Sequence, residues 1–136
     1  DQFNYHVVGR RYNGGLSIAS SDAVIAYIFG SLDGVSKVGY YTGNGSSTAR
    51  TIDCGFSTGA RFIIIKALTL SRSWVVLDTL QGINSGAADP NFYLQSTSGQ
   101  VTAVDWVSPH NSGFQLVTNQ GNVNDTNELY MFYAIA

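Results

Sequence analysis

Both tryptophans in this sequence stand close to a carboxylate, a pairing that many carbohydrate-binding sites use. Asp78 follows shortly after Trp74, and Asp105 directly precedes Trp106. An indole ring can stack on a sugar ring, while a carboxylate accepts hydrogen bonds from the sugar hydroxyls. The candidate ligand-binding residues are therefore Trp74, Asp78, Asp105 and Trp106. The same pairing also arises where a buried strand ends in a polar residue, so a core or interface position is the alternative.

The other reactive side chains do not form a catalytic or metal-binding pattern. His6 and His110 are far apart, and neither has Cys, Asp or Glu neighbours at the spacing of zinc ligands. Cys54, the single cysteine, follows Asp53, whose negative charge disfavours the thiolate that a nucleophile requires. The nine acidic residues could supply the carboxylate pair of a glycosidase, but most fall in turns or at strand ends. We therefore expect no enzyme activity, no cofactor and no metal.

Low charge is the clearest feature of the composition. Of the 136 residues, 12% are charged and 44% are hydrophobic, whereas globular proteins average about 25% charged residues. Lys and Glu, which usually cover exposed helix surfaces, are almost absent. The net charge of −2 leaves no basic patch for nucleic acid, and no apolar run reaches the ~18 residues of a membrane helix. We expect neither nucleic-acid binding nor membrane insertion.

The elements that must position the candidate residues are short strands. Fifteen glycines, with many Asn, Ser and Thr residues, separate alternating apolar segments, as in strands joined by tight turns. The predicted strands are Tyr5–Arg11, Leu16–Ala19, Ala23–Phe29, Lys37–Thr42, Arg50–Cys54, Arg61–Leu68, Ser73–Leu77, Phe92–Ser96, Val101–Trp106, Gly113–Thr118 and Leu129–Ala136. One open sheet rarely holds so many strands. The predicted fold is therefore all-β, an antiparallel β-sandwich that is jelly-roll-like, with about ten to eleven short strands.

Two segments are apolar on both faces, Phe62–Ile65 and Leu129–Ala136. Such a strand lies in the centre of a covered sheet, or its outward side meets another subunit. Gln81–Asn91 is the longest predicted loop, and Ser108–Asn111 and Gln120–Asn122 are predicted turns. Long loops are where a compact β-domain varies its binding surface.

A segment near the N-terminus is similar to the C-terminal strand. Val24–Gly30 and Tyr130–Ala136 are both alternating and aromatic-rich, with a central tyrosine and a small residue at the end. Either two strands of one domain over residues 1–136 look alike, or residues 1–35 end a preceding repeat and residues 36–136 form the unit. Because the chain begins at Asp1 rather than Met, we also expect that sequence upstream was removed or left out.

Five motifs follow one another over about residues 36–136. They are Tyr-Thr-Gly-Asn-Gly at 41–45, Phe-Ile-Ile-Ile-Lys at 62–66, Trp-Val-Val-Leu-Asp at 74–78, Gly-Phe-Gln-Leu at 113–116 and the closing strand Leu129–Ala136. This order resembles a β-rich repeat domain in structural and tail-fibre proteins of tailed, often marine, bacteriophages. The chain departs from that pattern at Cys54, where a polar residue would be expected, and in the loop Gln81–Asn91.

The resemblance implies a non-enzymatic structural protein on the exterior of a virion. It would act as a fibre, tail or capsid-decoration module that assembles with copies of itself, as a homotrimer, and with other virion proteins. The low charge agrees with self-association, because few charged side chains would lose water in the contact. The alternative is a lectin-like module that recognises a bacterial surface glycan, and both functions can coexist in a receptor-binding fibre.

Overall fold

The computed structural model describes residues 28–136. The strands predicted at Tyr5–Arg11, Leu16–Ala19 and Ala23–Phe29 lie wholly or mostly outside the described residues, as does most of the N-terminal copy of the similar segment. The chain divides into two units, residues 1–30 and residues 31–136. The fold given below is that of the second unit.

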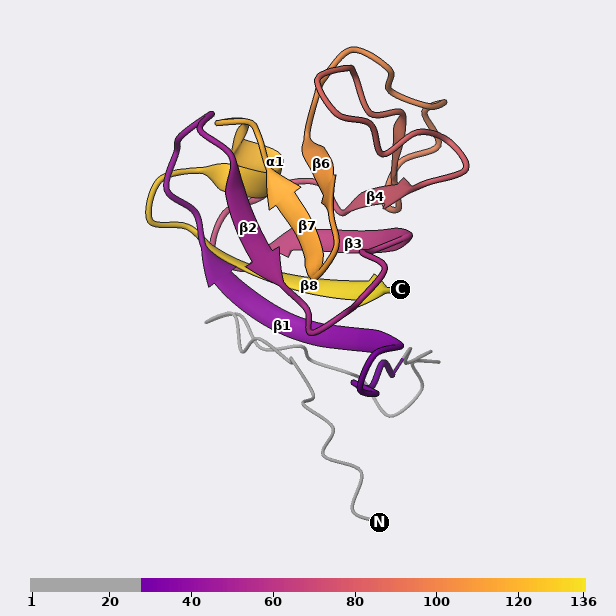
Figure 1. The fold of residues 1–136 in the computed structure, drawn as a ribbon. Coiled ribbons are helices and arrows are strands. Elements are labelled where there is room, and N and C mark those ends of the chain that lie inside the picture. Colours follow the sequence, from indigo (N-terminus) through magenta and orange to yellow (C-terminus); the bar gives the residue numbers. More distant parts are fainter. Residues whose placement is uncertain (1–27) are drawn as a thin grey trace, which may run out of the picture. The chain divides into compact units, whose positions relative to one another are not determined.

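The second unit is all-β, and its eight strands form two antiparallel sheets (Figure 1). The larger sheet has the order β1-β8-β3-β4-β5, and the smaller has the order β2-β7-β6. The strands are β1 (Ser36–Thr42), β2 (Arg50–Asp53), β3 (Phe62–Ala67), β4 (Val75–Asp78), β5 (Asn91–Tyr93), β6 (Val107–His110), β7 (Gly113–Leu116) and β8 (Leu129–Ile135). A single helical turn, α1 (Gly121–Asn124), lies where the sequence predicted a turn. The predicted antiparallel two-sheet fold is confirmed, with eight strands among the described residues.

The strand pairing is nested in its outer part, as in a jelly roll. The first strand of the unit pairs with the last, β1 with β8, and the second pairs with the second last, β2 with β7. The inner part differs, because β3 and β4 pair with each other inside the larger sheet. Strands β8 and β3 both lie inside the five-stranded sheet, which confirms the central position, one of the two alternatives that their apolar residues predicted.

The core lies between the two sheets. Alternate residues of the larger sheet, among them Ile63, Ile65 and Phe132, are buried against Phe114 and Leu116 of β7. The rings of Phe114 and Phe132 meet edge to face with their centroids 5.6 Å apart. Such an aromatic contact adds about 1 kcal/mol to what burial alone contributes. The inward side of each sheet therefore forms part of the core.

One predicted strand is wrong in its position. The sequence predicted a strand at Val101–Trp106 and a turn at Ser108–Asn111, but β6 occupies Val107–His110. Pro109 is an unusual residue within a strand, because proline cannot donate a hydrogen bond to a sheet. It is tolerated in β6 because this strand lies at the edge of its sheet, where a missing N–H need not break a ladder.

Candidate functional site

The outward residues of the five-stranded sheet form a surface that we call the outer face. Side chains alternate along a strand, and residues paired across neighbouring strands share a side of the sheet. The registers therefore place together Ser36, Val38, Tyr40 and Thr42 of β1, Leu129, Met131, Tyr133 and Ile135 of β8, Phe62, Ile64 and Lys66 of β3, Val76 and Asp78 of β4, and Phe92 of β5. Trp74 and Leu94 extend the same alternation just beyond β4 and β5, where the Leu94 N–H donates to the Trp74 carbonyl.

A row of apolar side chains crosses the outer face over all five strands. The row consists of Val38, Tyr133, Ile64, Val76 and Phe92, each paired with the next. In the adjacent row, which contains Lys66, Tyr40 on β1 and Leu94 beyond β5 are 45% and 60% exposed. Among the described elements, the smaller sheet and α1 lie on the opposite, inward side of the larger sheet (Figure 1).

The outward side of the three-stranded sheet is polar. Its positions hold Thr51 and Asp53 of β2, Gln115 of β7 and His110 of β6, and the Gln115 amide donates to the Thr51 hydroxyl at 3.1 Å. That is the usual pattern of an antiparallel sheet with one side in water. The outer face departs from this pattern, and large apolar patches on a protein surface mark contact sites. We therefore take the outer face as the candidate functional site.

Two charged residues lie on the outer face, Lys66 on β3 and Asp78 on β4. The Lys66 ammonium donates to the carbonyl of Ala67 at 2.8 Å, and the Asp78 carboxylate accepts the N–H of Gln81 at 2.8 Å. Burial lowers the pKa of Lys66, and the negative charge of Glu128 opposes that change. Neither Lys66 nor Asp78 forms an ion pair with another described residue.

The structure separates the four ligand-binding candidates into two pairs. Trp74 and Asp78 lie on the outer face at the two ends of β4, and both are half-buried. Trp106 is 2% exposed and belongs to the core, so its ring is not on the surface. Its indole N–H donates to the side chain of Asn91 at 3.0 Å. Asp105 directly precedes Trp106 and interacts electrostatically with Asp89.

Asp89 is the centre of a buried polar cluster in this second region. Its carboxylate is fully buried and accepts three backbone N–H groups, those of Asn84 at 2.9 Å, Trp106 at 2.7 Å and Val107 at 2.8 Å. Burial raises the pKa of Asp89, and the three hydrogen bonds oppose that change. These contacts hold the chain before β6 out of a regular strand, which explains the displaced strand. No local signal in the sequence separates Asp89 from the other acids.

Asp105 adds a second carboxylate to the edge of this cluster. Burial raises its pKa, and the charge of Asp89 adds to the effect. One oxygen of Asp105 and the side-chain nitrogen of Asn91 are buried without a partner among the described residues. In that part of the chain, no group of three or more His, Cys, Asp or Glu side chains is placed to hold a metal.

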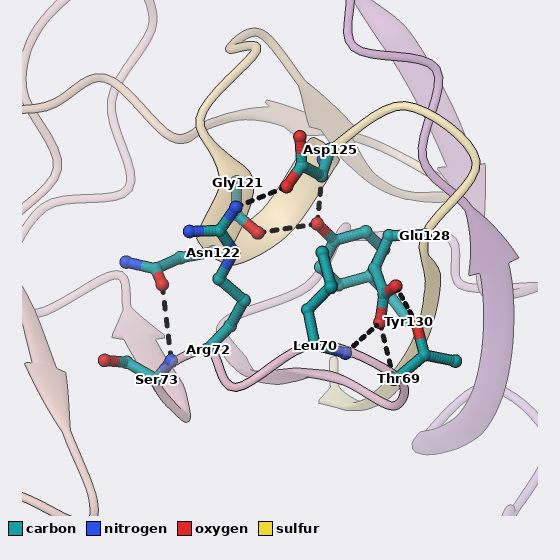
Figure 2. Close-up of polar contacts among 9 residues, drawn as sticks. All are labelled: Thr69, Leu70, Arg72, Ser73, Gly121, Asn122, Asp125, Glu128 and Tyr130. Atoms are coloured by element: carbon teal, nitrogen blue, oxygen red, sulfur yellow. Dashed lines mark hydrogen bonds and ion pairs between the residues drawn. The ribbon is translucent and has the colours of Figure 1, made fainter.

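A polar network fixes the segment that leads into Trp74 (Figure 2). Arg72 forms an ion pair with Asp125 at 2.5 Å, and the Ser73 N–H donates to the Asn122 side chain at 3.3 Å. Both partners of the ion pair are more than a third exposed, so the pair stabilises the fold by ~0–1 kcal/mol at most. The network therefore orients the start of β4 more than it stabilises the domain.

Glu128 anchors the start of the same segment. It is buried and accepts the backbone N–H groups of Thr69 at 2.6 Å and Leu70 at 3.1 Å, together with the Thr69 hydroxyl (Figure 2). Burial alone would raise the pKa of Glu128, but these hydrogen bonds together outweigh burial and lower it. The ionised carboxylate is therefore the form that the fold favours.

Replacing Glu128 by glutamine should lower the free energy of unfolding by about 1–2 kcal/mol at neutral pH. The pKa of Glu128 is lower in the folded than in the unfolded chain. Its contribution is therefore present above the unfolded-state pKa and is lost as the pH falls through the folded-state pKa. Urea denaturation of wild type and Glu128→Gln at a series of pH values should show their difference shrinking in acid. A difference that stays constant with pH would contradict this role.

The described cysteine and histidine do not provide a nucleophilic centre. Cys54 is buried, and burial, with a further contribution from Asp53, raises the pKa of its thiol to about 11. The His110 ring nitrogen Nδ1 lies 3.1 Å from the Ser112 hydroxyl and accepts the Ser112 N–H at 3.3 Å, and His6 lies outside the described residues. No helix in the described part of the chain is long and apolar enough to cross a membrane.

The fold and the outer face define an all-β domain of two antiparallel sheets with one apolar outward surface. Over residues 4–136 the chain matches the family DUF7483, a domain of unknown function, and it belongs to that family. No curated protein and no solved structure matches the chain. The family match includes most of the first unit and all of the second. Because the family description assigns no function, the resemblance to bacteriophage domains stays a prediction.

Proposed function

We propose that this chain is a non-enzymatic structural module that works by self-assembly through the outer face. The setting is the one that the motif resemblance implies, the exterior of a bacteriophage virion, with other virion proteins as further partners. The observation that carries the proposal is the apolar row across all five strands, on a domain whose smaller sheet is polar outside.

The chemistry of the outer face suits a protein contact. Its two charges are a small fraction of its residues, so little charge would have to be desolvated on assembly. Tyr40, Phe92 and Trp74 add aromatic side chains, which are enriched where protein contacts gain most of their binding energy. The β-sheet beneath them keeps these side chains in place, so that little conformational entropy is lost on binding.

A lysine in the apolar row should break the assembly. Val76→Lys buries an unpaired ammonium in the contact, so we expect self-association to weaken by 100-fold or more, about 3 kcal/mol. Light scattering of the full chain over a range of concentrations would measure this. Phe92→Lys, at a more exposed position of the same row, should act in the same direction if Val76→Lys disturbs folding.

Thr51→Lys is the matched control, because it places the same charge on the outward side of the smaller sheet. It should leave the association unchanged. Equal association of the wild type, Val76→Lys and Phe92→Lys would show that assembly does not use the outer face, and the proposal would fail.

The second candidate function is glycan recognition, favoured by the position of Trp74 on the outer face. Trp74 directly precedes β4; its carbonyl accepts the Leu94 N–H, and its backbone N–H donates to the side chain of the polar residue Gln95 at 2.9 Å. Because Trp106 is buried, a change in tryptophan fluorescence on adding bacterial surface polysaccharide would report mainly on Trp74. Absence of any change would count against the lectin-like function.

A further inference from the structure

We propose that the partner on the outer face is a second copy of this chain, packed face to face about a two-fold axis. In this arrangement Lys66 of each copy meets Asp78 of the other. The inference rests on the proposed function, because it specifies the geometry of that assembly. The proposed assembly has two copies, whereas the resemblance to bacteriophage domains implied a homotrimer.

The two charges cannot meet within one copy. Lys66 is level with Met131 of the neighbouring strand β8, whereas Asp78 is paired with Phe62, which lies four residues from Lys66 on the same strand. Four residues along a strand correspond to about 13 Å, and the step from β3 to β4 adds a lateral separation of about 4.8 Å. A lysine side chain cannot span that distance. Each charge therefore lacks an ionic partner among the described residues.

A two-fold axis in the plane of the contact gives both charged residues an ionic partner. In a symmetric face-to-face contact, if one residue meets a second on the partner, the second also meets the first. One positive and one negative residue on the face are then sufficient for two identical ion pairs. The contact has no net charge, and the ammonium and carboxylate are both compensated where burial would otherwise be costly.

The area of the outer face is compatible with a pair of copies. Strands of three to seven residues, about 4.8 Å apart and rising about 3.4 Å per residue, cover on the order of 450 Å² in plan. Two such faces bury on the order of 1,000 Å², which is the lower limit for a specific contact. A three-fold ring would instead set each outer face against a different surface, and the outward side of the smaller sheet is polar.

Charge reversal tests the pairing. Lys66→Asp alone would place two carboxylates against each other at both symmetric positions, and Asp78→Lys alone would place two ammonium groups there. We expect each variant to associate at least 100-fold more weakly than wild type in sedimentation experiments on the full chain. The double variant Lys66→Asp/Asp78→Lys should regain association to within about tenfold, because the pair is restored with its signs exchanged.

Mixing the two single variants is the sharper experiment. In a two-fold pair of one Lys66→Asp chain and one Asp78→Lys chain, both contacts join opposite charges. The mixture should therefore form a one-to-one complex although neither variant associates alone. This result also shows that both variants fold, and Thr51→Lys serves as the control for an unrelated charge.

The outcomes separate this inference from the proposed function. If the single variants associate weakly and neither the double variant nor mixing restores association, the Lys66–Asp78 pairing is overturned. The outer face would still be the contact surface. A restored complex with the mass of three copies would overturn the two-fold axis. Wild type that stays monomeric at every concentration would mean that the outer face does not contact a second copy. That result would overturn the inference and the proposed function together.

Discussion

Replacing Asp89 by alanine is expected to lower the free energy of unfolding by about 4 kcal/mol. The Asp89 carboxylate is fully buried and accepts the N–H groups of Asn84, Trp106 and Val107. Alanine removes all three acceptors at once, and each buried N–H left without a partner costs ~1–3 kcal/mol. Typical domains have only 5–15 kcal/mol of stability in total. Urea denaturation at neutral pH would measure the loss.

The asparagine variant tests whether the hydrogen bonds are the cause. One oxygen of Asp89 accepts the N–H groups of both Trp106 and Val107, and the other accepts that of Asn84. Asp89→Asn can keep its oxygen on the first two donors, so we expect about half the loss of the alanine variant. The control is Asp33→Ala, at an exposed acid before β1, with a change of less than about 0.5 kcal/mol. A loss below 1 kcal/mol for Asp89→Ala would contradict the role of this cluster.

Replacing Asn124 by alanine should cost about 3 kcal/mol. Asn124 is fully buried in α1, and its side-chain nitrogen donates to the Asn44 side chain and to the carbonyls of Ser46 and Thr118 at 2.8–3.0 Å. Its side-chain oxygen accepts the Asn44 N–H at 3.0 Å. Asn124 therefore connects the turn after β1 to the segment before β8, and its loss leaves several buried polar groups unpaired.

Asn124→Asp should be at least as damaging as Asn124→Ala, because it sets a carboxylate oxygen against three acceptors. Asn122→Ala is the matched control on α1, since that side chain is only half-buried and its two contacts are both 3.3 Å long. We expect it to cost less than about 1 kcal/mol. Thermal or urea unfolding of the three variants would rank them. Equal stability of Asn124→Asp and wild type would contradict the proposed contacts.

The same contacts give a physical reason for the Tyr-Thr-Gly-Asn-Gly turn at residues 41–45. Gly45 has a φ of 63°, and a Cβ at this position would collide with the side chain of Thr126. Only glycine adopts this conformation easily and leaves room for Thr126. The motif that contributed to the resemblance is therefore a place where the chain packs tightly against the segment before β8.

The fold was predictable because its strands alternate and end in turns. β1 and β7 lie within two residues of the predicted bounds, since an alternating apolar pattern followed by Gly or Asn is a local signal. β6 was predicted in the wrong place because its boundary depends on Asp89, which lies 17 residues before the N–H that it binds. No spacing rule captures a contact of that kind.

The candidate site was predictable only in part. The sequence indicated that Phe62–Ile65 and Leu129–Ala136 are apolar on both sides. That their outward residues lie side by side on one surface follows only from the sheet order, which the sequence did not predict. Proximity to a carboxylate could not show that Trp74 lies on the outer face while Trp106 points into the core. Likewise, Glu128 binds a loop 59 residues earlier in the chain, so only the tertiary structure reveals its role.

The most direct test of self-assembly through the outer face is sedimentation velocity of the full wild-type chain over a wide range of concentrations. The mass should rise from the 14.6 kDa of one copy to that of a defined oligomer, which is two copies for the face-to-face arrangement. A single species of 14.6 kDa at every concentration would contradict the account.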